Sequence, residues 1–151
     1  MVEDKLRQMG IELPAAPTPL AAYIPAVKAG DFAYTSGQIP LVKGELKYKG
    51  KVGAELTEAD GYQAARVCAI NCLSALKGVI GDLDNIERIV KVVGFVNSAP
   101  GFAAQPKVIN GASELFGEVF GDAGKHARSA VGVSELPIDS AVEVEVIVKL
   151  K

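Results

Sequence analysis

Residues 142–149 read Val-Glu-Val-Glu-Val-Ile-Val-Lys, and this stretch decides the fold. Valine occupies every second position, as apolar residues do on the buried face of a strand. The alternate positions point the other way and hold Glu143, Glu145, Ile147 and Lys149. Because an apolar sheet face must be covered, the pattern predicts a sheet whose valine face lies under helices. We call the opposite side the helix-free face.

Two amphipathic helices are predicted to supply that cover. The first follows a capping box, Thr57-Glu58-Ala59-Asp60, and ends at Gly81. Its apolar residues recur at spacings of three and four, at positions 62, 65, 69, 72, 76 and 80. The second is predicted within 102–120, with Pro106 in its first turn and an apolar stripe at 108, 112, 115, 116 and 119.

The remaining elements complete one α+β domain spanning residues 1–151. Strands are predicted at 32–36, 89–96, 127–134 and 141–150, and a short helix at 2–10. Residues 42–53 indicate an exposed loop or short hairpin, and residues 11–25 are predicted to be extended because four prolines break any helix there: Pro14, Pro17, Pro19 and Pro25. The order of elements predicts a sheet with both main helices on one face.

Side-chain alternation in the strand at 127–134 predicts where the polar residues lie. Val131 and Val133 share one face, while Arg128, Ala130 and Gly132 share the other. If the valine faces of the last two strands coincide, Arg128 emerges beside Glu143 on the helix-free face. A face that mixes small residues, an isoleucine and charges predicts an association surface around a polar pocket.

Composition narrows the classes of partner and location. The 151 residues carry a formal net charge of -2, with 49% hydrophobic and 23% charged residues, which favours a single folded domain. Proteins that bind nucleic acid usually have a basic balance, so RNA or DNA is not expected as the main partner. No stretch reaches the roughly 20 apolar residues of a membrane helix. The acidic start at residues 1–5 is not typical of a secretory signal.

The cysteines and the single histidine argue against a metal or thiol site. Cys68 and Cys72 lie four residues apart inside a helical pattern, which predicts buried free thiols and a reducing, cytoplasmic location. No second histidine or nearby cysteine accompanies His126 to build a metal site. We interpret His126 as a surface residue beside the start of a strand.

Several short motifs, taken in order, resemble the RidA family, also called the YjgF or L-PSP endoribonuclease family. They are Thr35-Ser36-Gly37-Gln38-Ile39-Pro40, Ala127-Arg128-Ser129 followed by Leu136-Pro137, and Val142-Glu143-Val144-Glu145. Order and spacing are those of the family from about residue 23 to residue 148. Each motif alone is a weak signal, whereas the ordered set is specific.

The resemblance implies a chorismate-mutase-like α+β subunit in a homotrimer, with three sites in the clefts between subunits. It also implies hydrolysis of reactive 2-imino (enamine/imine) acids to 2-oxo acids and ammonia without a cofactor or metal. Arg128 then matches the arginine that binds the substrate carboxylate, and Glu143 the acid that positions water. The matching pocket-lining positions are Tyr23, Ser36, Gly37 and Asn110, with Ala130 where the family often has cysteine.

Other roles stay open at this stage. The same Arg128 could serve a non-catalytic sensor or binding protein for small carboxylates, a chorismate-mutase-like reaction is a further alternative, and RNA cleavage is the activity behind the family's other name. At the level of residues, Arg128 could instead form a structural ion pair with Glu143 or Glu145. Because the two glutamates share a face, they could also exchange roles.

Overall fold

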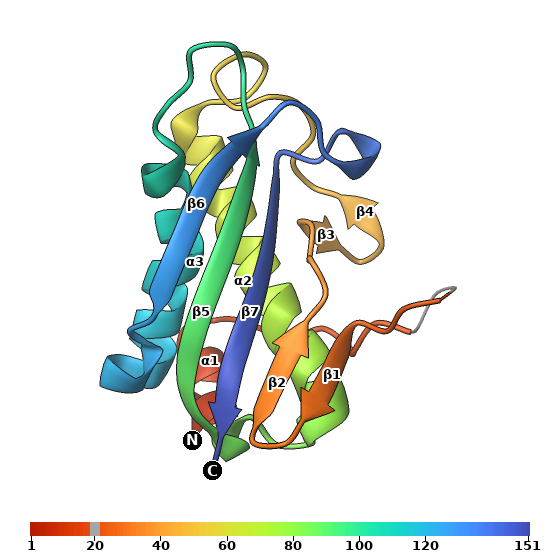
Figure 1. Cartoon of the computed structure of the whole chain (residues 1–151), viewed down its shortest axis with the longest axis vertical. Coiled ribbons are helices and arrows are strands. Elements are labelled where there is room, and N and C mark those ends of the chain that lie inside the picture. The colour runs from red at the N-terminus through yellow and green to blue at the C-terminus, as the bar shows by residue number, and fades with distance from the viewer. Residues whose placement is uncertain (19–21) are drawn as a thin grey trace.

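The valine-rich stretch forms β7 (Val142–Leu150), the central strand of a five-stranded sheet ordered β1-β2-β7-β5-β6 (Figure 1). The computed structural model describes residues 1–18 and 22–151. Only β5 and β6 run parallel, and the other neighbouring strands pair antiparallel. The other bounds are β1 (Ala26–Ala29), β2 (Phe32–Thr35), β5 (Ile86–Asn97) and β6 (Ala127–Val133). The predicted mixed α+β sheet is confirmed.

Two long helices, α2 (Glu58–Ile80) and α3 (Gln105–Phe120), lie against one face of this sheet (Figure 1). The predicted capping box begins α2: the hydroxyl of Thr57 accepts from the amide of Asp60, and the carboxylate of Asp60 accepts from the amide of Thr57. Gly81, with φ of 81°, ends this helix. Pro106 lies in the first turn of α3, as predicted.

The alternation predicted for β7 is confirmed. Its four valines are at most 1% exposed and pack in the core beneath α2 and α3. The alternate residues from Glu143 to Lys149 are only partly buried and face the helix-free side. The thiols of Cys68 and Cys72 are free and buried, and they approach the carbonyls of Val142 and Val144 from the helix side.

The predicted orientation of β6 is wrong. In the parallel register Val92 lies opposite Arg128 and Val96 opposite Gly132, and residues paired in this way point to the same side. Both valines are fully buried under the helices, so Arg128 and Gly132 face the helix side together with Ala130. Val131 is 44% exposed on the helix-free face. Arg128 and Glu143 therefore emerge on opposite faces of the sheet.

Small residues on β5 and β6 explain this orientation. A Cβ at Gly94 would lie 2.4 Å from Cδ1 of Ile109 on α3, and a Cβ at Gly132 would lie 2.7 Å from Nε2 of Gln105. Gly132, one of the small positions that indicated a partner surface, instead leaves room for a side chain of α3.

The N-terminal segment folds onto the domain. Helix α1 (Val2–Gln8) buries Leu6, and the amide of Val2 donates to Asp84 at 2.8 Å. Strand β1 was not predicted, because the residues before it are rich in proline. It forms a hairpin with β2 through Gly30 and Asp31. Pro19 lies outside the described residues.

A second hairpin occupies part of the predicted loop at 42–53. Strands β3 (Leu41–Val42) and β4 (Glu45–Leu46) are joined by Lys43 and Gly44, whose φ values of 51° and 80° are those of a type I′ turn. The described residues also include three short 3₁₀ helices: η1 (Leu83–Asn85), η2 (Gly121–Gly124) and η3 (Pro137–Asp139). Within the described ranges, none of the helices combines the length and the apolar character needed to span a membrane.

Candidate functional site

Arg128 extends from β6 towards α3, where two side chains hold one of its nitrogens. Nη1 donates to Oδ1 of Asn110 at 2.8 Å and to Oγ of Ser113 at 3.2 Å. Asn110 and Ser113 lie three residues apart, so they share one side of the helix. Nε and Nη2 make no hydrogen bond to residues 1–18 or 22–151, and none of those residues forms an ion pair with Arg128. The alternative of a structural ion pair with Glu143 or Glu145 is therefore not realised within one chain.

Ser113 links Arg128 to His126. Its Oγ lies 2.9 Å from Nε2 of His126, and Nδ1 of His126 lies 2.6 Å from the carbonyl of Gly124. The imidazole and the Phe116 ring pack at right angles in a T-shaped arrangement, with centroids 6.2 Å apart. Burial lowers the pKa of His126, and the positive charge of Arg128 lowers this pKa further. His126 is thus half-buried and hydrogen-bonded rather than the surface residue that the sequence indicated.

Glu143 lies on the opposite side of the sheet, against the Thr35–Pro40 motif. The backbones of Gln38 and Val144 exchange two hydrogen bonds, of 2.8 and 3.0 Å, which fix the motif alongside β7. A Cβ at Gly37 would lie 2.6 Å from the carboxyl carbon of Glu143, so a larger residue there would displace this carboxylate from its position. Burial raises the pKa of Glu143, and the negative charge of Glu145 raises it further.

Ser36 and Tyr23 lie close to the same segment along the chain. The hydroxyl of Ser36 donates to the carbonyl of Ile24 at 2.7 Å, so it ties the residue after Tyr23 to the end of β2. Tyr23 itself is 62% exposed. The Ser36 hydroxyl is therefore committed to the backbone, whereas the Tyr23 ring is accessible.

Glu145 has different surroundings. It lines a hollow of about 110 Å³ on the helix-free face, together with Tyr34, Thr35, Lys91, Val93, Val146 and Ile147. Glu143 contacts the Gly37 segment instead. The two glutamates lie on the same face of the sheet, but they contact different residues.

The predicted site residues fall into two groups within one chain. The Arg128 half comprises Asn110, Arg128 and Ala130 on the helix side of the edge strand β6. The Glu143 half comprises Tyr23, Ser36, Gly37 and Glu143. Strand β5 separates β6 from β7, and Arg128 and Glu143 point to opposite faces, so one chain does not bring the two halves together.

Sequence reasoning missed the role of Ser113 and undervalued His126. Both carried a signal: Ser113 follows Asn110 at helical spacing, and His126 has the same strand parity as Arg128. Neither signal identified a contact, because the packing of α3 on β6 had to be known first.

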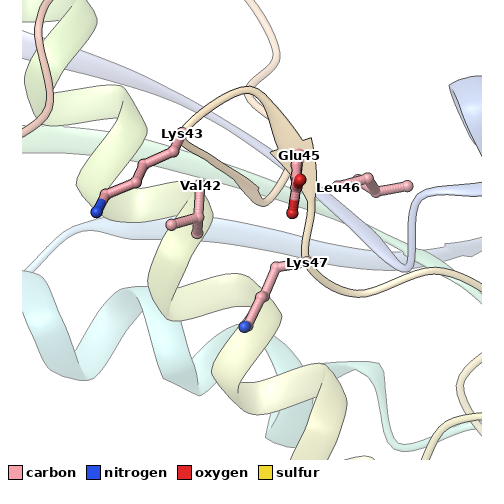
Figure 2. Close-up of a pocket in the computed structure, with 5 residues that line it drawn as sticks. All are labelled: Val42, Lys43, Glu45, Leu46 and Lys47. Atoms are coloured by element: carbon pink, nitrogen blue, oxygen red, sulfur yellow. The ribbon is translucent and has the colours of Figure 1, made fainter.

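A larger hollow, of about 420 Å³, lies at the β3–β4 hairpin and contains none of the predicted site residues (Figure 2). Its lining comes from residues 42–47 of that one hairpin. Within the described residues, no cluster of three His, Cys, Asp or Glu side chains could hold a metal ion.

Sequence comparison matches residues 3–150 to the family described as "YjgF/chorismate mutase-like, putative endoribonuclease". Protein TCP17 of Trypanosoma cruzi is 45% identical over 150 residues, which cover 99% of this chain and 94% of that protein. The crystal structure of the protein Atu1372 from Agrobacterium tumefaciens is 41% identical, with a TM-score of 0.93, and the match covers 99% of this chain and 92% of the other.

Two further relatives carry functional names. A 2-iminobutanoate/2-iminopropanoate deaminase of Dermatophagoides farinae is 32% identical, over 93% of this chain and 95% of that protein. The crystal structure of E. coli TdcF with bound serine is 25% identical, with a TM-score of 0.62, over 90% and 94% of the two chains. The sheet order, the two covering helices and these matches agree, and the chain belongs to the RidA/YjgF family.

Proposed function

We propose that this chain hydrolyses 2-imino acids to 2-oxo acids and ammonia at sites formed between the subunits of a homotrimer. The observation that carries the proposal is the hydrogen bonding of the Arg128 guanidinium. Its Nη1 is anchored, no carboxylate in residues 1–18 or 22–151 pairs with it, and its Nε and Nη2 keep their hydrogens available. A guanidinium in this state suits a ligand carboxylate, which it can bind through two charge-assisted hydrogen bonds.

Glu143 supplies the second requirement of the reaction. Water adds to the C2 carbon of the protonated imine, two protons pass from the water oxygen to the nitrogen, and the C–N bond then breaks to release ammonium and leave the 2-oxo acid. A half-buried carboxylate with a raised pKa can take a proton from the water and return it to the nitrogen. Its negative charge also stabilises the iminium group. The bound carboxylate and the water would thus be held by different residues.

The opposite orientation of Arg128 and Glu143 supports sites between subunits. A small 2-imino acid cannot reach both side chains of one chain, so the Arg128 half of one subunit must meet the Glu143 half of another. The helix-free face also exposes apolar side chains that a partner would cover, including Val27, Tyr34 and Val131. A trimer closes this arrangement with three equal sites.

Light scattering during size exclusion tests the assembly. The expected mass is three times the 15.7 kDa of one chain. A monomer at micromolar concentration would rule out the shared site, because the two halves would then never meet.

The names of the relatives support the type of reaction, but they do not identify the substrate of this chain. One carries the name of a 2-iminobutanoate/2-iminopropanoate deaminase, and another holds serine, which is itself a small amino acid with a carboxylate. Both names are consistent with a pocket that recognises short 2-substituted carboxylic acids.

Turnover decides between an enzyme and a binding protein. An amino-acid oxidase generates imines from a panel of L-amino acids, and release of the 2-oxo acid is followed with and without this protein. An enzyme accelerates release when present far below the imine concentration. A protein that binds 2-oxobutanoate but leaves release at the uncatalysed rate would be the carboxylate sensor instead.

RNA cleavage is the second candidate, because the family description includes endoribonuclease activity. The net charge of -2 argues against it. Cleavage of RNA by the purified trimer that disappears in Arg128→Ala would favour this role, whereas cleavage that persists would originate elsewhere.

A further inference from the structure

We infer that Ser113 and His126 are positioning residues for Arg128, which they hold so that the Nε–Nη2 edge of the guanidinium is the one presented to a ligand carboxylate. The inference rests on the proposed function for the identity of the ligand. The contact between the three side chains stands independently of it.

The geometry of the guanidinium decides which edge is available. Nη1 carries two hydrogens and has two acceptors, Oδ1 of Asn110 at 2.8 Å and Oγ of Ser113 at 3.2 Å. The terminal Nη1–Nη2 edge is therefore already engaged at Nη1. Nε and Nη2 each keep a hydrogen that points in the same direction, and this pair matches the two oxygens of a carboxylate.

His126 sets the orientation of the Ser113 hydroxyl. The carbonyl of Gly124 can only accept, so Nδ1 of His126 carries the ring proton in the 2.6 Å contact. Nε2 of the neutral ring must then accept from Ser113. With its hydrogen directed at His126, the hydroxyl of Ser113 turns a lone pair to Arg128. Loss of Ser113 would free one side of Nη1, and loss of His126 would remove the contact that orients the Ser113 hydroxyl.

Among the described residues, Arg128 is the charged group that acts on the pKa of His126. Burial and the Arg128 charge both lower the pKa of His126. Four other charged groups on neighbouring elements are engaged elsewhere: Glu114 with Tyr62, Glu118 with Arg66, Lys125 with Asp122, and Arg88 with the carbonyl of Lys125. A carboxylate bound to Arg128 would offset the charge that lowers this pKa.

Occupancy of the site should therefore be coupled to protonation of His126. A bound carboxylate raises the pKa of His126, and by reciprocity a protonated His126 strengthens carboxylate binding. Binding of a carboxylate ligand should tighten as pH falls through the pKa of His126, which lies below its ordinary value.

The sole histidine makes this coupling measurable without resonance assignment. The C2 proton of His126 is titrated by NMR in the assembled protein, free and saturated with 2-oxobutanoate. We expect a higher pKa in the saturated protein. In the ligand-free protein, Arg128→Ala should also raise this pKa, whereas the control Arg66→Ala should leave it unchanged because Arg66 pairs with Glu118 on the α2–α3 surface.

Calorimetric affinities for 2-oxobutanoate test the positioning role. Ser113→Ala should weaken binding by about tenfold, the order expected for a lost hydrogen bond to a charged group. Ser113→Thr should restore most of it, since it returns the hydroxyl. The affinity of the wild type for 2-oxobutanoate should depend on pH below neutrality, and His126→Gln should remove this dependence. Melting temperatures of these variants separate binding losses from unfolding.

The results separate this inference from the proposed function. The inference would be overturned if Ser113→Ala and the wild type had equal affinities. It would also be overturned if Arg128→Ala left the His126 pKa of the ligand-free protein unchanged. Absence of both imine hydrolysis and 2-oxobutanoate binding would instead reject the proposed function. The Arg128→Ala titration of the free protein would still decide whether Ser113 and His126 hold Arg128.

Discussion

Strands β6 and β7 carry similar alternating sequences, yet only β7 lies as its alternation predicts. The valines of β7 are buried, and its glutamates face the helix-free side. In β6 the valine at 131 is exposed, while Arg128 and Ala130 face the helices. Strand β7 is central and β6 is an edge strand. At an edge, the face with the larger apolar side chains is not always the covered one.

The difference follows from what each strand has to accommodate. Helix α2 packs on β7 at a distance that valine fills, so hydrophobic burial sets the orientation of this strand. Side chains of α3 instead occupy the space above two glycines, Ile109 above Gly94 of β5 and Gln105 above Gly132 of β6. This packing requires small residues on the helix side of both strands. It also places Arg128 against Asn110, beside the helix rather than in the helix-free sheet face.

The largest expected effect compares the charged residue of each strand. Arg128→Ala should lower kcat/KM for imine hydrolysis by about a hundredfold or more, because a partly desolvated charge-assisted pair costs about 2–5 kcal/mol when truncated. Arg128→Lys should recover little, since ammonium lacks the planar fork. Glu143→Gln on β7 should lower kcat more than it raises KM. Steady-state kinetics of each folded variant provide the measurement.

Light scattering and melting curves serve as the control for these kinetics. If Arg128→Ala remains assembled and hydrolyses imines at the wild-type rate, the Arg128 half is not part of the site. An equal rise in KM for Glu143→Gln and Arg128→Ala would remove the distinction between the two strands.

A smaller effect tests the packing of α3. Gly94→Ala should destabilise the protein by about 1–3 kcal/mol, because the new methyl overlaps the buried side chain of Ile109. Gly132→Ala is the matched change on β6 and should cost much less, since the end of the flexible Gln105 side chain can move away. Urea unfolding of both variants measures the difference. Equal losses would show that the Gln105 side chain is held above Gly132 as firmly as Ile109 is held above Gly94.

Much of the fold could be predicted from the sequence because single segments determine it. The capping box at Thr57, the glycine that ends α2 and the alternation of β7 each act within a few residues. Strand β1 was missed because Pro25 and the residues before it indicate irregular backbone. Only the pairing of β1 with β2 reveals it as a strand.

The candidate site was predicted less completely, because it depends on contacts between segments. The motifs identified Arg128 and Glu143 as residues, but not the faces on which they lie. The choice of face for Arg128 rests on Gly94 and Ile109, which belong to other elements. Ser113 and His126 become meaningful only when α3 lies over β6.

The buried thiols behind β7 provide a smaller effect still. A Cys68→Ala, Cys72→Ala double variant should lose roughly 1–2 kcal/mol of stability through the space left beneath β7. Turnover per folded protein should be unchanged, because the thiols contact β7 from the helix side and Glu143 lies on the other. Activity measured against the folded fraction tests this expectation. Complete loss of turnover in a folded double variant would point to thiol chemistry.

The smallest expected effect is a pH dependence of stability that belongs to β7. The pKa of Glu143 is raised above 4.5 by burial and by the charge of Glu145. The folded state therefore binds this proton more tightly than the unfolded chain. The stabilising contribution is fully present below about pH 4.5 and is lost as pH rises through the raised pKa. At neutral pH the ionised Glu143 consequently opposes folding.

Glu143→Gln removes that titration, so the variant should melt at a slightly higher temperature than the wild type at pH 7. The advantage should shrink towards pH 4, where the wild-type carboxyl is protonated. In Glu145→Gln, the stabilising contribution of protonated Glu143 should be lost at a lower pH than in the wild type, because the charge of Glu145 helps to raise the Glu143 pKa. Melting curves recorded between pH 4 and 7 at constant ionic strength test both. Parallel curves for Glu143→Gln and the wild type would mean that the pKa of Glu143 is not raised in the assembled protein, and such a carboxylate would be poorly suited to pass protons from water to the imine nitrogen.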